Sequence, residues 1–263
     1  MILLPPSEGK SSGGDGAPLV LNSLSFKSLN PMRERIAKAL ISVSDRPRSS
    51  RTLLGVKGPA LEKARAENAE LRSAPTLPVI QRYTGVMYDA IEHETLGTNE
   101  RGAFGRSVII MSGLFGMVRP FDMIPAYKLK MGGKLMRGKS CAAVWKRLIT
   151  ESLADSAQGG VVWDLLPNEH SAAWDSSSVH YASRFTVKFV QHSAAGQIKT
   201  VNHWSKLLKA ALVRHLVSNE KAAGAPDSAL DLVAGFSHPE GYEFSEELTS
   251  TADDVTDIVF VKG

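Results

Sequence analysis

The sequence predicts a mixed α/β (α+β) fold in a single compact domain over residues 1–263. Two observations carry this prediction. Segments typical of buried strands alternate with amphipathic helices through most of the chain, without internal repeats. Apolar residues make up 43% of the chain and charged residues 22%, the balance of a globular protein that buries a core. We therefore expect a mixed sheet with flanking helices.

Prolines mark the N-terminal elements. Ile2–Leu4 is a short apolar run that Pro5 stops, which predicts a buried first strand leading into a polar, glycine-rich loop. Asn30 and Pro31 fit the N-cap and the first residue of a helix, and a second helix is expected from Pro59 to about Arg72. The basic, proline-broken stretch between these two helices is expected to be a connector.

The remaining elements are predicted from apolar spacing, which recurs every three to four residues in helices and alternates or forms short runs in strands. In chain order they are a helix over Val86–Glu94, a strand over Ser107–Met111, a half-buried strand over Tyr127–Met131, a helix over Cys141–Leu153, and strands over Val161–Trp163 and Phe185–Val190, followed by a helix over Lys206–Val217. The acidic tail from Asp227 to Gly263 carries enough aromatic and branched residues to fold with them.

The net charge of +4 hides an uneven distribution. Residues 1–150 carry 23 basic and 12 acidic side chains, whereas residues 151–263 carry 8 and 15. The basic half predicts a surface suited to phosphate, and the acidic half would limit how the protein sits on a polyanion. Charge alone leaves open whether that phosphate belongs to nucleic acid or to a small ligand.

Cysteine and histidine usage excludes several kinds of site. Cys141 is the only cysteine, so the chain has no intramolecular disulfide, no Cys-x-x-Cys redox pair and no cysteine-ligated iron–sulfur cluster. The seven histidines show no tight ligand spacing, so no metal and no cofactor is predicted. The N-terminus lacks the features of a signal peptide, and no apolar run approaches about 18 residues, which predicts a cytoplasmic protein without a membrane partner.

Residues 133–140 formally match the phosphate-loop pattern Gly-x-x-x-x-Gly-Lys-Ser. In such a loop, backbone amides would hold a phosphate while Lys139 reached its terminal group and Ser140 bound magnesium. The interior of this loop is bulky, whereas wrapping around phosphate favours small residues. We therefore favour a basic anion-binding loop and keep nucleotide hydrolysis at Lys139 as a weaker alternative.

A helix-hairpin-helix-like element is predicted over about residues 46–72. Its two glycines would let a tight hairpin present backbone amides to a nucleic-acid phosphate. They are separated by two residues, whereas the usual pattern has one, so an ordinary helix–helix turn with a solvated basic face remains the alternative. The DNA-binding residues predicted here are Arg51, Gly55, Lys57, Gly58, Lys63 and Arg65.

Loop residues elsewhere predict a second, anion-binding cleft. Arg119 and Asp122 lie in a loop that leaves a buried strand, where a guanidinium can bind phosphate or carboxylate, although a structural Arg–Asp pair is the alternative. Glu169 comes just after a predicted strand, where a catalytic carboxylate could lie, although a carboxylate there could equally cap a turn. The residues predicted to line this cleft are Ser7, Lys10, Tyr83, Ser112, Arg119, Asp122, Tyr127 and Lys139.

Several segments together resemble the YaaA family of peroxide-stress proteins. They run in order over nearly the whole chain and include Pro5–Lys10, Tyr83–Gly85, Ser112–Gly116, Arg119–Asp122, Arg137–Lys139, Asn168–Glu169 and Glu240–Tyr242. The resemblance implies a bacterial cytosolic protein of one mixed α/β domain, with a DNA-binding helix-hairpin-helix-like element beside a basic cleft. It also implies a role in limiting oxidative damage by lowering free intracellular iron, and that Gly133 and Ser140 are incidental to the Arg-Gly-Lys motif.

Two functions follow from these observations. The first is a DNA-binding cytosolic protein of the peroxide stress response that contacts backbone phosphates with little base readout. The alternative is an enzyme acting on a nucleobase, nucleotide or other phosphorylated small molecule. In that enzyme Glu8 or Glu169 would be the acid or base, and Lys10, Arg119 and Lys206 would hold an anionic group. These five side chains should then meet in one cavity.

Overall fold

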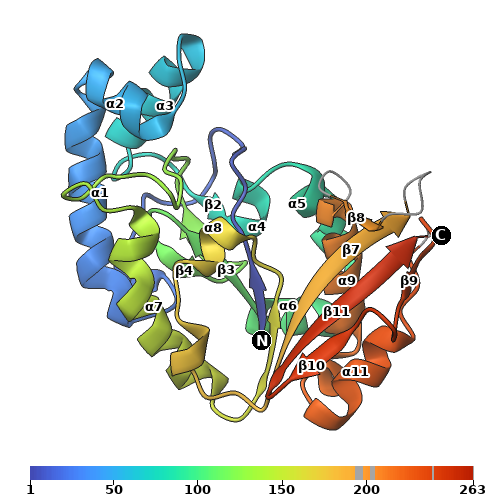
Figure 1. The fold of residues 1–263 in the computed structure, drawn as a ribbon. Helices are drawn as coiled ribbons and strands as arrows, with labels where there is room; N and C mark the ends of the chain where they lie inside the picture. The colour runs from blue at the N-terminus through green and yellow to red at the C-terminus, as the bar shows by residue number, and fades with distance from the viewer. Residues whose placement is uncertain (193–197, 202–204, 239, 263) are drawn as a thin grey trace.

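The computed structural model describes residues 1–192, 198–201, 205–238 and 240–262. The chain forms the mixed α/β fold that the sequence predicts (Figure 1). Within these ranges one mixed sheet holds nine strands, and β2 (Leu77–Pro78) pairs separately with β5 (Met123–Ile124). The strands of the large sheet are β1 (Ile2–Leu4), β3 (Val108–Ser112), β4 (Gly116–Val118), β6 (Val161–Asp164), β7 (Ser183–His192), β8 (Ile198–Thr200), β9 (Tyr242–Phe244), β10 (Ser250–Ala252) and β11 (Val255–Lys262).

Parallel strands in the order β3-β1-β6-β7-β11 form the centre of the large sheet. Counted along the chain, this order is 2-1-3-4-5. The chain therefore moves to one side of β1 to form β3, and then to the other side of β1 to form β6. Such a reversal leaves a crevice at the carboxyl ends of the two strands that flank it, here β1 and β6. Antiparallel strands complete the sheet: β4 beside β3, β8 beside β7, and β9 and β10 beside β11.

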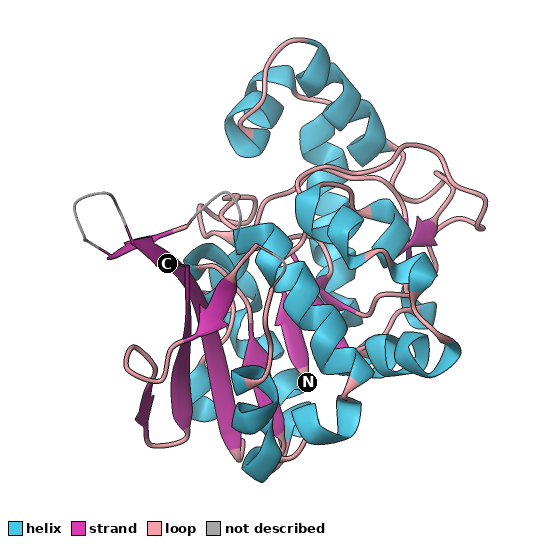
Figure 2. Cartoon of the chain, turned by 90° about the vertical axis from the view of Figure 1, so that its right-hand side faces the viewer, coloured by secondary structure: helices cyan, strands magenta, loops and turns pink. Residues whose placement is uncertain are grey.

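Helices surround the sheet, and two of them extend away from it. In Figures 1 and 2, α2 and α3 project from the end of α1 as a separate hairpin. The helices of the described chain are α1 (Asn30–Ser44), α2 (Pro47–Leu54), α3 (Pro59–Ala69), α4 (Val79–Arg82), α5 (Val86–Ile91), α6 (Thr98–Ser107), α7 (Cys141–Ala157), α8 (Asn168–Ser171), α9 (Ser205–Ser218), α10 (Glu220–Ala223) and α11 (Pro226–Ala234).

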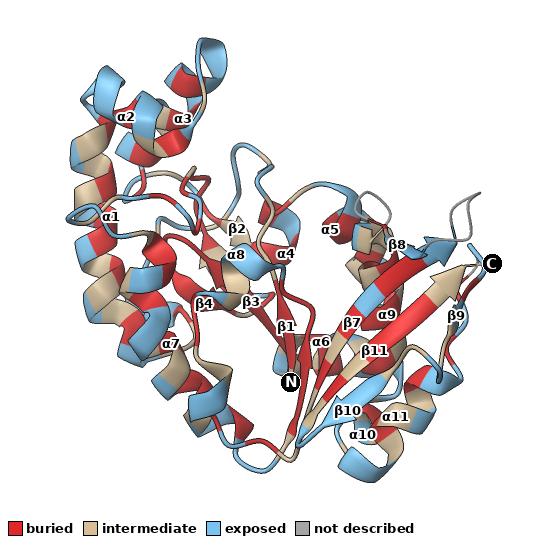
Figure 3. Cartoon of the chain, in the orientation of Figure 1, coloured by how far each residue is buried: buried red, intermediate tan, exposed pale blue. Residues whose placement is uncertain are grey.

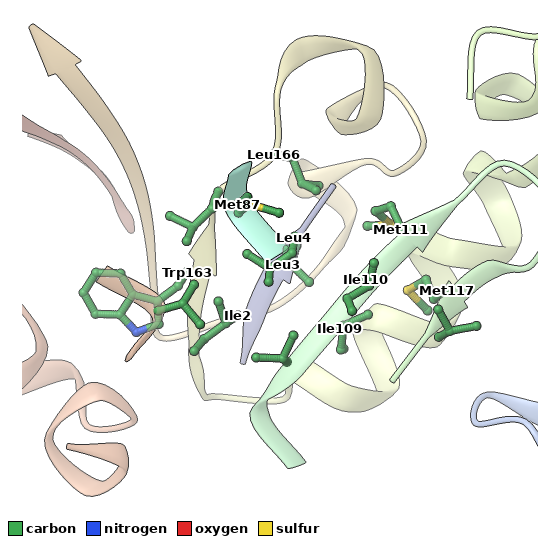
Figure 4. Close-up of a cluster of buried hydrophobic side chains, with 14 of the residues drawn as sticks. Ile2, Leu3, Leu4, Met87, Ile109, Ile110, Met111, Met117, Trp163 and Leu166 are labelled. Atoms are coloured by element: carbon green, nitrogen blue, oxygen red, sulfur yellow. The ribbon is translucent and has the colours of Figure 1, made fainter. Parts of the chain in front are cut away.

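The first strand lies at the centre of the hydrophobic core. Its three side chains are at most 3% exposed and pack among residues of β3, β6 and α5 (Figure 4). A parallel strand covered on both faces is apolar at every position, which explains why Ile2–Leu4 is a continuous run. Figure 3 shows buried residues concentrated in the central strands and exposed residues on the projecting α2 and α3.

The predicted elements recur with small shifts, but the predicted connector before the second helix is wrong. It contains α2, because Pro47 at the first helical position needs no hydrogen-bond partner, and Ser50 and Leu54 are buried against the neighbouring helices. Asn30 also differs from the prediction. It lies inside α1, whose N-cap is Leu29, and its side chain accepts a hydrogen bond from the Arg33 guanidinium (2.8 Å).

The segment Tyr127–Met131 alternates between buried and accessible residues as predicted, but it is not a strand. Its Lys128 backbone pairs with a side chain instead. The Lys128 N–H donates to Asn68 Oδ1 (2.8 Å), and Asn68 Nδ2 donates to the Lys128 carbonyl (3.0 Å). The Asn68 side chain thus supplies the backbone hydrogen bonds that a neighbouring strand would supply in a sheet. The segment lies outside the sheet and forms one wall of a pocket.

Candidate functional site

A narrow pocket opens at the carboxyl ends of β1 and β6, where the strand order creates a crevice. The loop after β1 and helix α8 after β6 both lie at this end of the sheet (Figure 1). The extended segment Tyr127–Met131 adds a third wall. The pocket is lined by Pro6, Ser7, Glu8, Lys10, Tyr127, Lys128, Leu129, Lys130, Met131, Glu169 and His170.

Lys10 brings a buried amine to this pocket. Its Nζ donates to the Ser7 carbonyl (3.0 Å) and lies over the ring faces of Tyr127 and Tyr83, 4.3 and 5.1 Å from their centroids. Burial, followed by the positive charge of Lys128, lowers the pKa of Lys10 from 10.5 to about 7. A large fraction of this amine is therefore neutral at physiological pH, the state in which a lysine can act as a base or a nucleophile.

A chain of hydroxyl groups fixes the tyrosine rings beside Lys10. The Tyr127 hydroxyl is 2.7 Å from the Tyr83 hydroxyl and 2.7 Å from Ser112 Oγ, and all three side chains are buried. Burial raises the pKa of Tyr127 to about 12 and that of Tyr83 well above its usual value. Both phenols therefore stay neutral, and their rings are packed in the protein rather than free to stack a base.

Charged and imidazole groups surround the pocket. Glu8 forms ion pairs with Lys128 and Lys130 (3.4 and 3.0 Å), and its hydrogen bond from Lys130 lowers the pKa of the Glu8 carboxyl. Glu169 accepts a hydrogen bond from the Gly132 N–H (2.8 Å). Both carboxylates are thus engaged by the walls of the pocket in this structure.

His170 is the functional candidate that the sequence reasoning missed. Its Nδ1 is buried without a hydrogen-bond partner, and burial lowers the pKa of the imidazole. Buried polar atoms are rarely unpaired, so an ordered water or a bound molecule would complete the hydrogen bonding of this nitrogen. The local signal for His170 is weak: it follows Glu169 just beyond a buried strand, and only the pairing of β1 with β6 brings it beside Lys10.

Arg119 and Asp122 lie outside the pocket. The Arg119 guanidinium donates to the Arg106 carbonyl and lies over the ring of Phe26 (5.3 Å). The Asp122 carboxylate accepts hydrogen bonds from the backbone N–H groups of Ser25 (3.0 Å) and Arg119 (2.9 Å). These two side chains hold loops together, and neither lines the pocket of Lys10.

Lys139 and Lys206 are both exposed and do not line the pocket. In the loop 133–140 the Lys139 N–H donates to the Met136 carbonyl of the same loop (2.9 Å). Ser140 Oγ caps α7 by accepting a hydrogen bond from the Ala143 N–H (3.2 Å). The loop therefore closes on itself instead of turning its amides toward a phosphate. Of the five side chains expected to meet in one cavity, only Glu8, Lys10 and Glu169 do so.

The hairpin of α2 and α3 has the two-glycine turn that the sequence predicts. Gly55 and Gly58 have φ values of 68° and 56°, in the region that favours glycine. A Cβ atom at either position would meet nothing within 4 Å. The glycines are therefore required by backbone conformation rather than by close packing, and the outer side of the turn is open.

The cations of the hairpin fall into two groups. Arg48, Arg51 and Lys57 are exposed, line one hollow at the turn, and form no ion pair within the described ranges. Lys63 and Arg65 are paired with glutamates of α3 at 3.7 and 2.7 Å. The predicted cationic surface is thus concentrated at the turn, while the charges further along α3 are already neutralised.

Three further features concern metal ligands, membrane-spanning helices and the lone cysteine. No group of three His, Cys, Asp or Glu side chains among the described residues is arranged to hold a metal ion. No helix in the same part of the chain combines the length and hydropathy needed to cross a membrane. Cys141 is buried, and burial raises the pKa of its thiol to about 12.

Comparison with known proteins identifies the family. A family model described as peroxide stress protein YaaA matches residues 1–248. A UPF0246 protein of Streptomyces coelicolor is 34% identical over 248 residues, which cover 94% of this chain and 92% of the relative. UPF0246 proteins of Corynebacterium efficiens and Corynebacterium glutamicum are 36% identical over 238 residues (89% of this chain, 92% of the relative) and 34% identical over 260 residues (95% and 98%). This chain therefore belongs to the peroxide stress protein YaaA family.

Proposed function

We propose that this chain is a cytoplasmic DNA-binding protein of the peroxide stress response, where it limits iron-driven damage. Membership of the family supports the role in stress. The observation that supports DNA as the partner is the exposed glycine turn, at which Arg48, Arg51 and Lys57 share one hollow without acidic partners in the described structure.

The hairpin suits a backbone phosphate better than a base edge. An anion in the hollow at the turn meets three exposed cations. The start of α3 adds little to them, because Pro59 has no N–H and the Leu61 and Glu62 N–H groups donate to the Gly58 carbonyl (2.9 and 3.2 Å). Contacts to phosphate position a protein on DNA but carry no sequence information. We therefore expect binding that is strongly dependent on salt and nearly independent of sequence.

Charge reversal at the turn tests the DNA proposal. The double variant Arg51→Glu/Lys57→Glu should bind duplex DNA at least about 10-fold more weakly at moderate salt. The slope of log affinity against log salt concentration should also become shallower by about 2, because each lost phosphate contact removes about 0.9 from that slope. Fluorescence anisotropy with a labelled duplex over a salt series measures both quantities.

The matched control for this test is Lys221→Glu on α10, an exposed lysine remote in sequence from the hairpin. It should change affinity by less than about 2-fold, since long-range effects of one surface charge are screened. DNA affinity that does not change with salt, or that survives the double reversal, contradicts the proposal.

The lone cysteine is unsuited to react with peroxide. Cys141 is 2% exposed with a pKa raised to about 12, whereas thiols that react with oxidants are accessible and have lowered pKa values. We expect the native thiol to react with iodoacetamide at least about 100-fold more slowly than in urea, as measured by mass spectrometry. Rapid labelling of the folded protein would refute this prediction.

A second candidate function is an enzyme that acts on a phosphorylated small molecule in the pocket of Lys10. The observation that favours it is the joint presence of a buried amine, the unpaired His170 Nδ1 and the rim lysines Lys128 and Lys130. A thermal-shift screen of nucleotides and sugar phosphates tests it. Stabilisation that Lys10→Met abolishes and Lys57→Glu retains supports this function, and no stabilisation by any compound contradicts it.

A further inference from the structure

We propose that Lys10 is an imine-forming amine, and that its pocket takes a compound in which an aldehyde or ketone carbonyl lies next to a phosphate. This inference rests on the second candidate function above and names the substrate class of that site. Four features of the pocket support it: the bonding of Lys10, the unpaired His170 nitrogen, the pair of lysines at the rim, and the narrow shape of the cavity.

The surroundings of Lys10 differ from those of a structural lysine. An ammonium group has three donors, and buried ones are normally satisfied by a carboxylate or by several acceptors. Here Nζ has the Ser7 carbonyl as its hydrogen-bond acceptor, while Glu8 pairs with the rim lysines instead. The amine also lies over the rings of Tyr83 and Tyr127, and Lys10 itself lines the pocket.

The pKa of Lys10, lowered to about 7 by burial, makes this amine available for attack at neutral pH. A lysine with the ordinary pKa of about 10.4 is neutral in fewer than about one molecule in 1,000 at pH 7. Desolvated lysines of this kind form Schiff bases with carbonyl compounds in other enzymes.

His170 can carry the protons that imine formation moves. The lone pair of the Lys10 nitrogen forms a bond to the carbonyl carbon, and the π electron pair of the carbonyl moves to its oxygen. Two protons then pass from the nitrogen to that oxygen, which leaves as water as the C=N bond forms. The His170 imidazole, which lines the same pocket and whose pKa burial lowers, accepts each proton and returns it to the oxygen, so the step needs no oxidant or reductant.

The rim of the pocket holds a carboxylate where a phosphate would fit. Glu8 bridges Lys128 and Lys130, yet its side chain is 67% exposed and can turn into solvent without loss of packing. A phosphate oxygen can replace the carboxylate oxygens on both lysines. The cavity beside these groups has a volume of about 50 Å³, which suits a short carbonyl chain better than a nucleobase.

The carbonyl could come from a small phosphorylated aldehyde or from the open-chain sugar of an abasic site in DNA. A third hollow lies between the pocket and the hairpin. Gly132 lines this hollow together with Arg48 and Leu53 of α2, and the Gly132 N–H donates to Glu169 at the pocket. DNA held at the hairpin is therefore the second source to test.

Reductive trapping tests the inference. The full chain is incubated with glyceraldehyde 3-phosphate and sodium cyanoborohydride at pH 7, and adducts are mapped by peptide mass spectrometry. We expect Lys10 to be labelled at least about 10-fold faster than any other lysine, with slower labelling in excess inorganic phosphate. Lys10→Arg should lose this adduct, Lys221→Arg should keep it, and His170→Gln should slow its formation. Adducts spread over exposed lysines without preference for Lys10 overturn the inference.

The same reaction with a duplex that contains one abasic site distinguishes the two sources. If only the small aldehyde is trapped, the pocket is assigned to a metabolite. If abasic DNA is trapped and the double variant Arg51→Glu/Lys57→Glu abolishes that trapping, the pocket is assigned to DNA. Thermal stabilisation by sugar phosphates without any Lys10 adduct supports the second candidate function and overturns imine formation. Failure of salt-dependent DNA binding overturns the first function and leaves the small-aldehyde result unaffected.

Discussion

Replacing Arg82 with leucine should lower the free energy of unfolding by about 3–5 kcal/mol, because it leaves buried polar groups unpaired. Arg82 is fully buried, and its guanidinium donates to four backbone carbonyls in three separate segments of the chain. The acceptors are Ser11 (2.6 Å), Gly13 (2.7 Å), Pro75 (3.2 Å) and Ile124 (3.2 Å). Leucine fills part of the space but satisfies none of these oxygens. Urea denaturation followed by circular dichroism measures the loss.

Arg72→Leu is the matched control, since Arg72 is half exposed and pairs with Glu34 at the surface. This substitution should lower the free energy of unfolding by less than about 1 kcal/mol, the usual range for an exposed ion pair. Equal effects of the two variants would contradict the role given to Arg82. Because the Ser11 carbonyl is one residue from Lys10, Arg82→Leu should also slow reductive labelling of Lys10 under conditions where the variant remains folded.

Many of the elements could be predicted from the sequence because their signals are local. The run Ile2–Leu4, the helices that begin near Pro31 and at Pro59, and the alternation over Phe185–Val190 each depend on neighbouring residues. The strand order could not be predicted in this way. It depends on pairs such as Ile2 with Val108 and Ile2 with Trp163, which are more than 100 residues apart in sequence.

The candidate site could also be predicted only where its signals are local. Lys10 and Glu169 follow apolar runs, so their positions at strand ends could be expected, and both line the pocket. Arg119 also follows a strand, but its partners are the Arg106 carbonyl and the Phe26 ring, which no local pattern indicates. His170 required knowledge that β1 and β6 are adjacent, because only that pairing brings α8 beside Lys10.

Removing the Lys10 amine should stabilise the protein at low pH and have progressively less effect as the pH rises. In the unfolded chain this lysine holds its proton up to about pH 10.5, and in the folded protein only up to about pH 7, because burial lowers the pKa. The unfolded state therefore binds more protons between these values, and stability rises with pH across that window. Below pH 7 both states are protonated, so the full cost of burying the ammonium is present.

Lys10→Met abolishes this dependence, so its advantage over the parent protein should be greatest near pH 6 and should shrink by about 1–2 kcal/mol toward pH 9. The Lys10 residue as a whole is half-buried, so water reaches part of it. This solvent contact makes the change in stability smaller than the full pKa difference would give. Other groups that titrate in this window, including the Met1 amine with its pKa lowered to about 6, are common to both proteins and cancel. Urea denaturation at pH 6, 7.5 and 9 measures the difference, with the exposed Lys221→Met as control. If the stability difference between Lys10→Met and the parent is the same at all three pH values, the amine has an ordinary pKa and is protonated at neutral pH.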